Sequence, residues 1–268
     1  MAAHRMPTLF LSHGSPLLAI TDSAARRFMS ALGARLPRPA AIVVLSAHHD
    51  AEPVEVTSST RPPTIHDFGG FPRELYELEY RAPGAPDLAA RVRDLLLDAD
   101  IEAVLEPRRG FDHGAWIPLK LMYPAADVPL VQVSIDSARD SKWHLALGRA
   151  LRSLRDAGVL VIGSGGATHN LGLYMYAAAR GDDAAPPAWV AQFNDWLAAA
   201  VDERRYDDLL AYRERAPYAA ENHPTQEHFL PLFATLGAAH DDEHGERIHA
   251  SYDRGLLSLD DYAFGFDA

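Results

Sequence analysis

Residues 41–48, AIVVLSAH, place a histidine three residues after the end of an uninterrupted run of five apolar residues. Such a run is typical of a strand that is covered on both faces, as the strands of parallel sheets are. The arrangement occurs twice more, because His13 follows TLFLS and His169 follows VLVIGSGGAT. Three separate strand-like runs therefore deliver a histidine at or just past their carboxyl ends.

The rest of the chain alternates between similar runs and helical patterns. Strands are predicted at residues 8–11, 41–45, 54–58, 101–105, 129–134 and 159–162. Helices are predicted at residues 23–36, 87–98, 117–123, 141–156, 187–203 and 226–236. This alternation predicts a single α/β domain over residues 1–268, with a mostly parallel central sheet flanked by helices. Residues 249–252 and 257–264 predict a small C-terminal β hairpin, and residues 177–187 a flexible loop.

The composition narrows the class of protein. The 268 residues are 48% hydrophobic and 23% charged, as in an ordinary globular protein. The net charge of −12 argues against a nucleic acid or an anionic membrane as the main partner. No apolar stretch approaches the roughly 18 residues of a membrane span, and the start lacks the features of a signal peptide. We therefore expect a cytoplasmic protein; the sequence does not indicate whether it is a monomer or a homo-oligomer.

The histidines point to a metal site. The chain has no cysteine, which excludes disulfides, thiolate zinc sites and iron–sulfur clusters. Ligands of an open α/β sheet bind outside the carboxyl ends of its strands, so His13, His48 and His169 are expected to meet there. Imidazoles with one possible carboxylate suit either Zn or Fe(II). His49 is expected to point to the opposite face, since neighbouring strand residues alternate.

A further candidate ligand lies in NHPTQEHFLPLF, residues 222–233. Pro224 and Thr225 look like a helix entrance, which would place His228 in the first turn. The positive end of the helix dipole disfavours imidazolium there and leaves the nitrogen free for a metal. Glu227 is an alternative carboxylate ligand, and His223 is predicted to be a loop residue.

Two turn-rich stretches could contact a ligand. Residues 62–72, PPTIHDFGGFP, combine His66, Phe68 and Phe71 in one loop, which could form a lid with stacking surfaces for an aromatic ligand or a tight surface turn. Residues 110–116, GFDHGAW, place His113 before a helix, either as a substrate contact or as a helix-entry residue. The run GSGG at residues 163–166 lacks the other residues of phosphate-binding and dinucleotide-binding motifs.

Taken together, the motifs resemble a known family. FLSHGSP, VVLSAHHD, PPTIHDFGGFP, GFDHGAWIPLKLMYP, VPLVQVSID, GSGGATHNL and PTQEHFLPL occur in the order seen in bacterial DOPA 4,5-dioxygenase-like proteins. These are class III extradiol ring-cleaving dioxygenases, with protocatechuate 4,5-dioxygenase as a more distant relative. The resemblance runs from about residue 7 to residue 237, and its combination of motifs is specific.

The resemblance implies metal ligands at His13, His48 and His228. It implies that His169 is the acid/base or a further ligand, and that His113 is an active-site histidine. Distant relatives use a glutamate as third protein ligand, which keeps Glu227 open. The implied reaction opens the ring of a catechol-type, DOPA-like substrate with O2, with Fe(II) for activity and Zn(II) possible in purified protein. His49 departs from the Trp that close relatives often carry, which affects substrate preference.

Two other functions fit the same residues. A zinc-dependent hydrolase on this scaffold would share the ligands, but its activity would survive without O2. A non-catalytic metal-binding or signalling relative would keep the fold without turnover.

Overall fold

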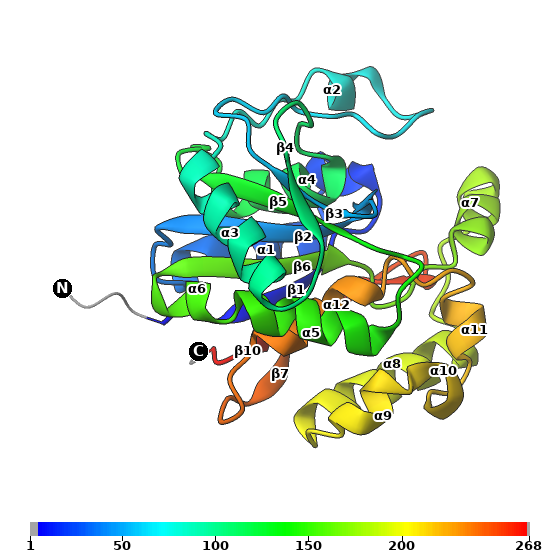
Figure 1. Ribbon diagram of the computed structural model, residues 1–268. Helices are drawn as coiled ribbons and strands as arrows, with labels where there is room; N and C mark the ends of the chain where they lie inside the picture. The colour runs from blue at the N-terminus through cyan, green and yellow to red at the C-terminus, as the bar shows by residue number, and fades with distance from the viewer. Residues whose placement is uncertain (1–4, 267–268) are drawn as a thin grey trace.

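Eight strands form the central sheet (Figure 1). In spatial order they are β4 (Ala103–Glu106), β3 (Val54–Thr57), β5 (Leu130–Ile135), β2 (Ala41–Asp50), β6 (Val159–Gly165), β1 (Thr8–Ser12), β10 (Asp261–Phe264) and β7 (Gly245–His249). The computed structural model describes residues 5–266, so the ends of the domain predicted over residues 1–268 lie outside the described residues. Within those residues, no helix is both long enough and apolar enough to cross a membrane.

The strands that matter for the site are parallel neighbours. β2 pairs in parallel with β5 and β6, and β6 pairs in parallel with β1. β3 and β4 are parallel to each other but antiparallel to β5. β10 adds an antiparallel strand on the other side of β1, and β7 pairs with β10. The prediction of a mostly parallel sheet is confirmed.

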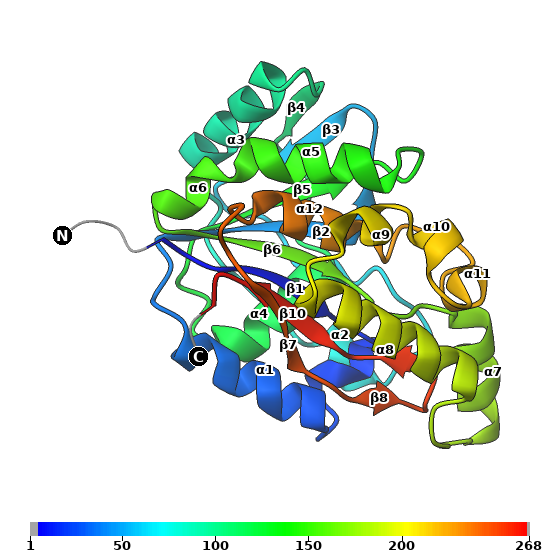
Figure 2. The ribbon, with the colours of Figure 1, turned by 90° about the horizontal axis from the view of Figure 1, so that it is seen from below.

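Helices cover both faces of the sheet (Figure 2). One face packs against α1 (Ala24–Arg35) and α4 (His113–Met122), and the other against α3 (Pro86–Asp98), α5 (Ser141–Leu151) and α12 (Leu230–Ala238). Alternate residues of β2 serve the two cores: Ile42 and Val44 face α1 and α4, while Val43 and Leu45 face α3, α5 and α12. This is why the run is apolar without interruption.

The remaining helices are shorter or lie at the rim of the sheet. They are η1 (Pro16–Ala19), α2 (Arg73–Tyr76), α6 (Ser153–Asp156), α7 (Leu171–Arg180), α8 (Ala188–Asp202), α9 (Tyr206–Leu210), α10 (Tyr212–Arg215) and α11 (Ala219–Asn222). α7 stands away from the sheet (Figure 1). The flexible loop predicted from residue 177 is therefore wrong over its first residues, because α7 continues to Arg180 and ends on Gly181 in the left-handed conformation.

The C-terminal segment contains more strands than predicted. β8 (Tyr252–Asp253) and β9 (Leu257–Ser258) form the small antiparallel hairpin, which is confirmed. The following strand, β10, joins the main sheet instead. There the backbone N–H of Ser12 donates to Asp261 Oδ1 at 2.8 Å and the Ser12 hydroxyl donates to the Asp260 carbonyl at 2.7 Å. The last strand is thus tied to the end of the first.

Candidate metal centre

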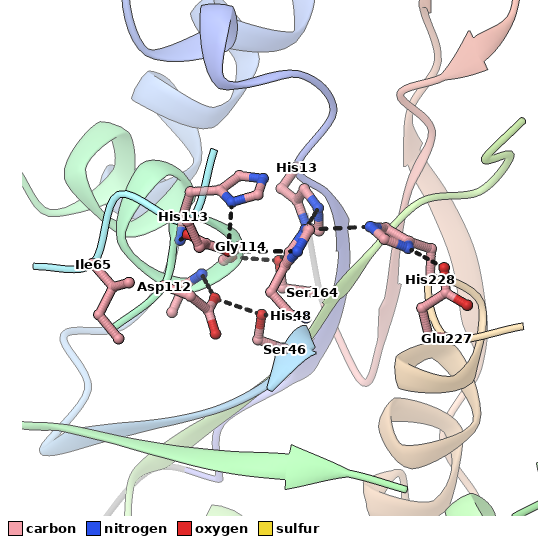
Figure 3. Close-up of polar contacts among 12 residues, drawn as sticks. His13, Ser46, His48, Ile65, Asp112, His113, Gly114, Ser164, Glu227 and His228 are labelled. Atoms are coloured by element: carbon pink, nitrogen blue, oxygen red, sulfur yellow. Dashed lines mark hydrogen bonds and ion pairs between the residues drawn. The ribbon is translucent and has the colours of Figure 1, made fainter. Parts of the chain in front are cut away.

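Three histidines from distant parts of the chain converge at the carboxyl edge of the sheet. His13 follows β1, His48 lies near the end of β2, and His228 lies in the turn before α12. His48 Nε2 is 3.0 Å from His13 Nε2 and 3.2 Å from His228 Nε2. Figure 3 shows the three rings pointing toward one another from separate elements.

An irregularity in β2 turns His48 into the site. The register of β2 against β5 shifts between Ser46 and Asp50, and such bulges re-aim side chains at functional sites. Gly114 at the start of α4 leaves room for the strand, because a Cβ there would lie 2.5 Å from Ser46 Oγ and 3.2 Å from His48 Cδ2. As expected, His49 is directed elsewhere, and its Nε2 is 2.9 Å from Glu55 Oε2.

Glycines at the end of β6 allow the turn that carries His228 to pack closely against the strand. A Cβ on Gly165 would lie 2.0 Å from the His228 carbonyl oxygen, and the N–H of Gly166 donates to that oxygen at 2.9 Å. The GSGG run thus allows close packing at this edge. The helix predicted from residue 226 begins later, at Leu230, because residues 224–229 form turns rather than helix. His228 therefore precedes the helix instead of lying in its first turn.

Hydrogen bonds fix which ring nitrogen of His13 and of His228 carries the proton. The Ser164 hydroxyl donates to the Gly114 carbonyl at 2.5 Å, so at 3.0 Å it must accept from His13 Nδ1. Glu227 Oε1 lies 3.1 Å from His228 Nδ1, and a carboxylate can only accept. With the protons on Nδ1, the lone pairs of His13 and His228 are on Nε2 and face His48.

Burial keeps these imidazoles neutral. Desolvation, reinforced by the neighbouring histidines, holds the pKa of His13 well below its usual value. The same two causes act on the pKa of His228, and burial lowers the pKa of His48 to about 4. At neutral pH, His13 Nε2 and His228 Nε2 therefore both present lone pairs to His48 Nε2, and a single proton on His48 Nε2 could satisfy only one of them. A cation is the group that fits this arrangement.

The distances also suit a metal. Nitrogens bound about 2.0–2.1 Å from one ion are separated by about 3.0 Å in octahedral and about 3.4 Å in tetrahedral geometry. The two Nε2 separations of 3.0 and 3.2 Å fall in this range. Imidazole is a suitable ligand for both Zn and Fe.

Two further histidines complete the cluster. The His169 ring stacks on His228 with centroids 3.4 Å apart, and burial lowers the pKa of His169 to about 4. The His113 ring lies 4.0 Å from the His48 ring and 5.3 Å from the His13 ring. Possible ligand atoms of His13, His48 and His113 lie within 4.8 Å of one another.

Glu227 belongs to a second such group, with His169 and His228. Its Oε1 also accepts from the Thr225 hydroxyl at 2.9 Å, in addition to facing His228 Nδ1. The geometry therefore gives Glu227 the task of orienting His228, which is the usual task of a carboxylate behind a ligating imidazole.

The site contains one polar residue that the sequence did not reveal. Asp67 accepts from the backbone N–H of His113 at 2.9 Å, and its Oδ2 is 3.0 Å from His113 Nδ1. The same oxygen lies 3.5 Å from His48 Nδ1. Burial alone would raise the pKa of Asp67, but the hydrogen bonds and charge of His113 lower it to about 2. Asp67 lies inside the loop of residues 62–72, where no spacing marks it.

A cavity of about 300 Å³ opens above the histidines. Phe68 and Phe71 belong to its wall. The Phe68 ring also contacts the His113 ring edge to face, with their centroids 5.6 Å apart. The lining residues are His13, Gly14, Ser15, Pro16, His48, Asp67, Phe68, Gly69, Phe71, His113, His169, Leu171, Tyr174, Met175, His228 and Leu257.

His66 and His223 lie outside this lining. His66 Nε2 bonds to the Leu78 carbonyl at 2.9 Å and its ring lies against Trp116, so the predicted contact between His66 and substrate is not supported by its position. His223 is a loop residue as expected, but it is fully buried, with Nε2 3.0 Å from the Ala167 carbonyl oxygen.

Known proteins are similar to this chain in sequence and in fold. Residues 7–264 match the family described as the catalytic LigB subunit of aromatic ring-opening dioxygenase. A 4,5-DOPA dioxygenase extradiol from Beta vulgaris is 42% identical over 96% of both chains. A protein of the same name from Escherichia coli (strain K12) is 44% identical over 89% of this chain and 87% of its own. The crystal structure of an uncharacterized protein from Escherichia coli K12 matches with a TM-score of 0.80 and 36% identity, over 97% of this chain and 100% of that one.

Proposed function

The chain belongs to the family of catalytic LigB subunits of aromatic ring-opening dioxygenases, and on this premise we propose that it opens catechol rings beside the diol with O2. The observation that carries the proposal is the convergence of His13, His48 and His228 beneath a cavity walled by aromatic side chains. The two relatives named above are called 4,5-DOPA dioxygenases, and we propose a DOPA-like catechol as substrate here.

We propose His13, His48 and His228 as the protein ligands and Fe(II) as the working metal. Sites with imidazole ligands and open positions are typical of non-haem Fe(II) oxygenases. When bound by these three imidazoles, such a metal would supply Lewis-acid chemistry that stabilises negative charge on substrate oxygens. Glu227 and Ser164 keep the Nε2 lone pairs of His228 and His13 directed at the ion, through their bonds to Nδ1.

His169 is the proposed acid/base. It lines the cavity beside His228 and its lowered pKa leaves the ring neutral at working pH, so it can accept a catechol proton. The proton held on the ring can be returned later in the reaction. Phe68 and Phe71 would bind the faces and edges of the aromatic ring and exclude water. The cytoplasmic location predicted from the sequence belongs to this proposal as well.

An anaerobic assay tests the proposal. The purified protein is loaded with Fe(II) without oxygen and then exposed to O2 and a panel of catechols. We expect consumption of one O2 per catechol and a yellow ring-opened product. Absence of oxygen uptake across the panel would falsify the dioxygenase proposal, and turnover of an ester or amide without O2 would favour a metal-dependent hydrolase instead.

Two histidine variants separate the proposed roles. We expect His169→Ala to retain metal but lose turnover by about 10²- to 10⁴-fold, as is typical of a missing general acid or base. His48→Ala should lose metal affinity by more than the roughly 100-fold typical of removing a group that only orients a ligand. His244→Ala is the matched control, because the His244 side chain is 57% exposed and lies outside the cavity. Loss of metal in His169→Ala would instead make His169 a ligand.

A further inference from the structure

Apart from its histidines, the substrate cavity has ionisable side chains of acidic character only. Its described lining contains no lysine and no arginine, and its one carboxylate is Asp67. Two more carboxylates lie directly behind lining side chains: Glu227 Oε1 is 3.1 Å from His228 Nδ1, and Asp253 Oδ2 accepts from the Tyr174 hydroxyl at 2.8 Å. A ligand in the cavity therefore meets the field of three carboxylates without a basic side chain among its contacts.

Two arginines near these residues, Arg109 and Arg254, form their hydrogen bonds outside the cavity lining. Arg109 donates to the His48 carbonyl at 2.9 Å and to Asp112 Oδ2 at 3.3 Å. Arg254 donates to the Asp182 carbonyl at 2.8 Å. Neither guanidinium lines the cavity, so neither offers a counter-charge to an anionic group held there.

The depth of the lining residues shows where a ring substituent would lie. His13 and His228 are only 2% and 5% exposed, whereas Leu171 and Met175 on α7 are 50% and 56% exposed. The histidines thus form the floor and α7 forms the mouth. A catechol with both oxygens at the floor directs the opposite side of its ring, and any group attached there, toward the mouth.

We infer that this cavity selects catechols by the charge of the ring substituent, favouring cationic or neutral groups over anionic ones. This inference rests on the proposed function and names the substrate class of the same site. The metal and the catechol oxygens are common to all such substrates, so their charges cancel in the comparison. The substrates then differ only in how the charge of the substituent interacts with the carboxylates. Across several ångströms of partly hydrated protein, we expect this interaction to change the binding affinity by about five- to tenfold.

A matched series of substrates tests the inference. Dopamine carries a cationic tail, 4-ethylcatechol a neutral one and 3,4-dihydroxyphenylacetate an anionic one, on the same ring. We expect kcat/KM to be about five- to tenfold lower for the acid than for the neutral compound, and dopamine to equal or exceed the latter. The difference should shrink as salt is added. Equal or better use of the acid would overturn the inference.

Binding without turnover keeps the two proposals distinguishable. The same three compounds are titrated into zinc-loaded protein by calorimetry in the absence of O2. If no catechol is oxidised by the Fe(II) protein but the order of affinities holds, the proposed function fails and the charge selection stands. If the compounds are oxidised but the acid binds as tightly as dopamine, the charge selection fails alone.

A charge placed at the mouth should reverse the preference. Met175→Arg puts a guanidinium on a half-exposed position of α7 that lines the cavity, where folding tolerates a long polar side chain. We expect its ratio of kcat/KM for the acid to that for dopamine to rise about tenfold. Met175→Gln has a similar length without charge, so it should keep the original order. An unchanged ratio in Met175→Arg would contradict the placement of the substituent at the mouth.

Discussion

The Asp67 carboxylate accepts two hydrogen bonds from His113 and also lies close to His48. Its oxygens accept from the backbone N–H and from Nδ1 of His113, and one of them lies 3.5 Å from His48 Nδ1. The next residue, Phe68, belongs to the cavity wall. Asp67 therefore holds a loop of the cavity against the histidine cluster and fixes the orientation of its rings.

The substitution Asp67→Asn tests this positioning role. An amide can accept with its oxygen only, so one of the two N–H groups of His113 would face an NH2 group. We expect a loss of turnover of about 10- to 100-fold, the range typical of lost orienting partners. A shift of the pH profile should accompany it, measured against Asp94→Asn, a change at an exposed carboxylate on α3. Wild-type kinetics and pH profile in Asp67→Asn would refute the role.

At the scale of elements, the contact between β6 and the turn before α12 holds His228 in place. Gly165 is the point of closest approach, since any side chain would collide with the His228 backbone. Gly163 has the same role two residues earlier, where a Cβ would lie 2.3 Å from the Pro231 carbonyl oxygen. The metal site thus depends on the absence of two side chains in a buried strand.

We predict that Gly165→Ala weakens both the fold and the metal site. The added methyl must displace the turn, and overpacking of this kind costs about 1–3 kcal/mol of unfolding free energy. Urea denaturation measures that cost, and a metal titration measures the displaced His228. Gly69→Ala is the control, because nothing lies within 4 Å of its added Cβ. Equal metal affinity in the two variants would show that the turn does not depend on Gly165.

The strands could be predicted from the sequence, but several contacts between elements could not. The runs before His13, His48 and His169 are strands, because a fully covered strand needs apolar residues on both faces. The sequence does not indicate α7, because LGLYMYAAAR has apolar residues around most of its circumference, including exposed ones such as Leu171 and Met175, and so lacks a polar face. The start of α12 was misplaced because Pro224 and Thr225 begin a turn, and only packing on Gly165 determines its path. Asp67 was missed because its partners lie far along the chain.

The molecule as a whole buries an unusual number of neutral imidazoles. Burial lowers the pKa of His223 to about 3, and its Nδ1 has no hydrogen-bond partner among the described residues to accept a proton. The pKa values of His13, His48, His169 and His228 are shifted in the same direction, with burial as the largest cause. In the unfolded chain a histidine has a pKa of about 6.5. The unfolded state therefore binds more protons than the folded state below that value.

We predict acid lability of the metal-free protein. The contribution of His223 is fully present above a pH of about 6.5 and is lost as pH falls toward its folded pKa of about 3. Each such histidine adds about 1.4 kcal/mol per pH unit to the slope of unfolding free energy within this window. His223→Gln should reduce the slope by up to that amount, measured by urea denaturation at several pH values between neutrality and about pH 5. An identical slope would show that His223 stays unprotonated in the unfolded chain or is protonated in the folded one.

The pairing of β1 with β10 bears on how the protein is made. The ribosome releases the strand of His13 early, but β6 and β10, its two neighbours, emerge much later. During much of translation the apolar strand β1 therefore has neither of its two partner strands, which makes it a candidate for chaperone binding. The ion cannot guide those early steps, since His228 has not yet been synthesised. A metal held by all three imidazoles would therefore stabilise a late, largely folded molecule rather than nucleate its folding.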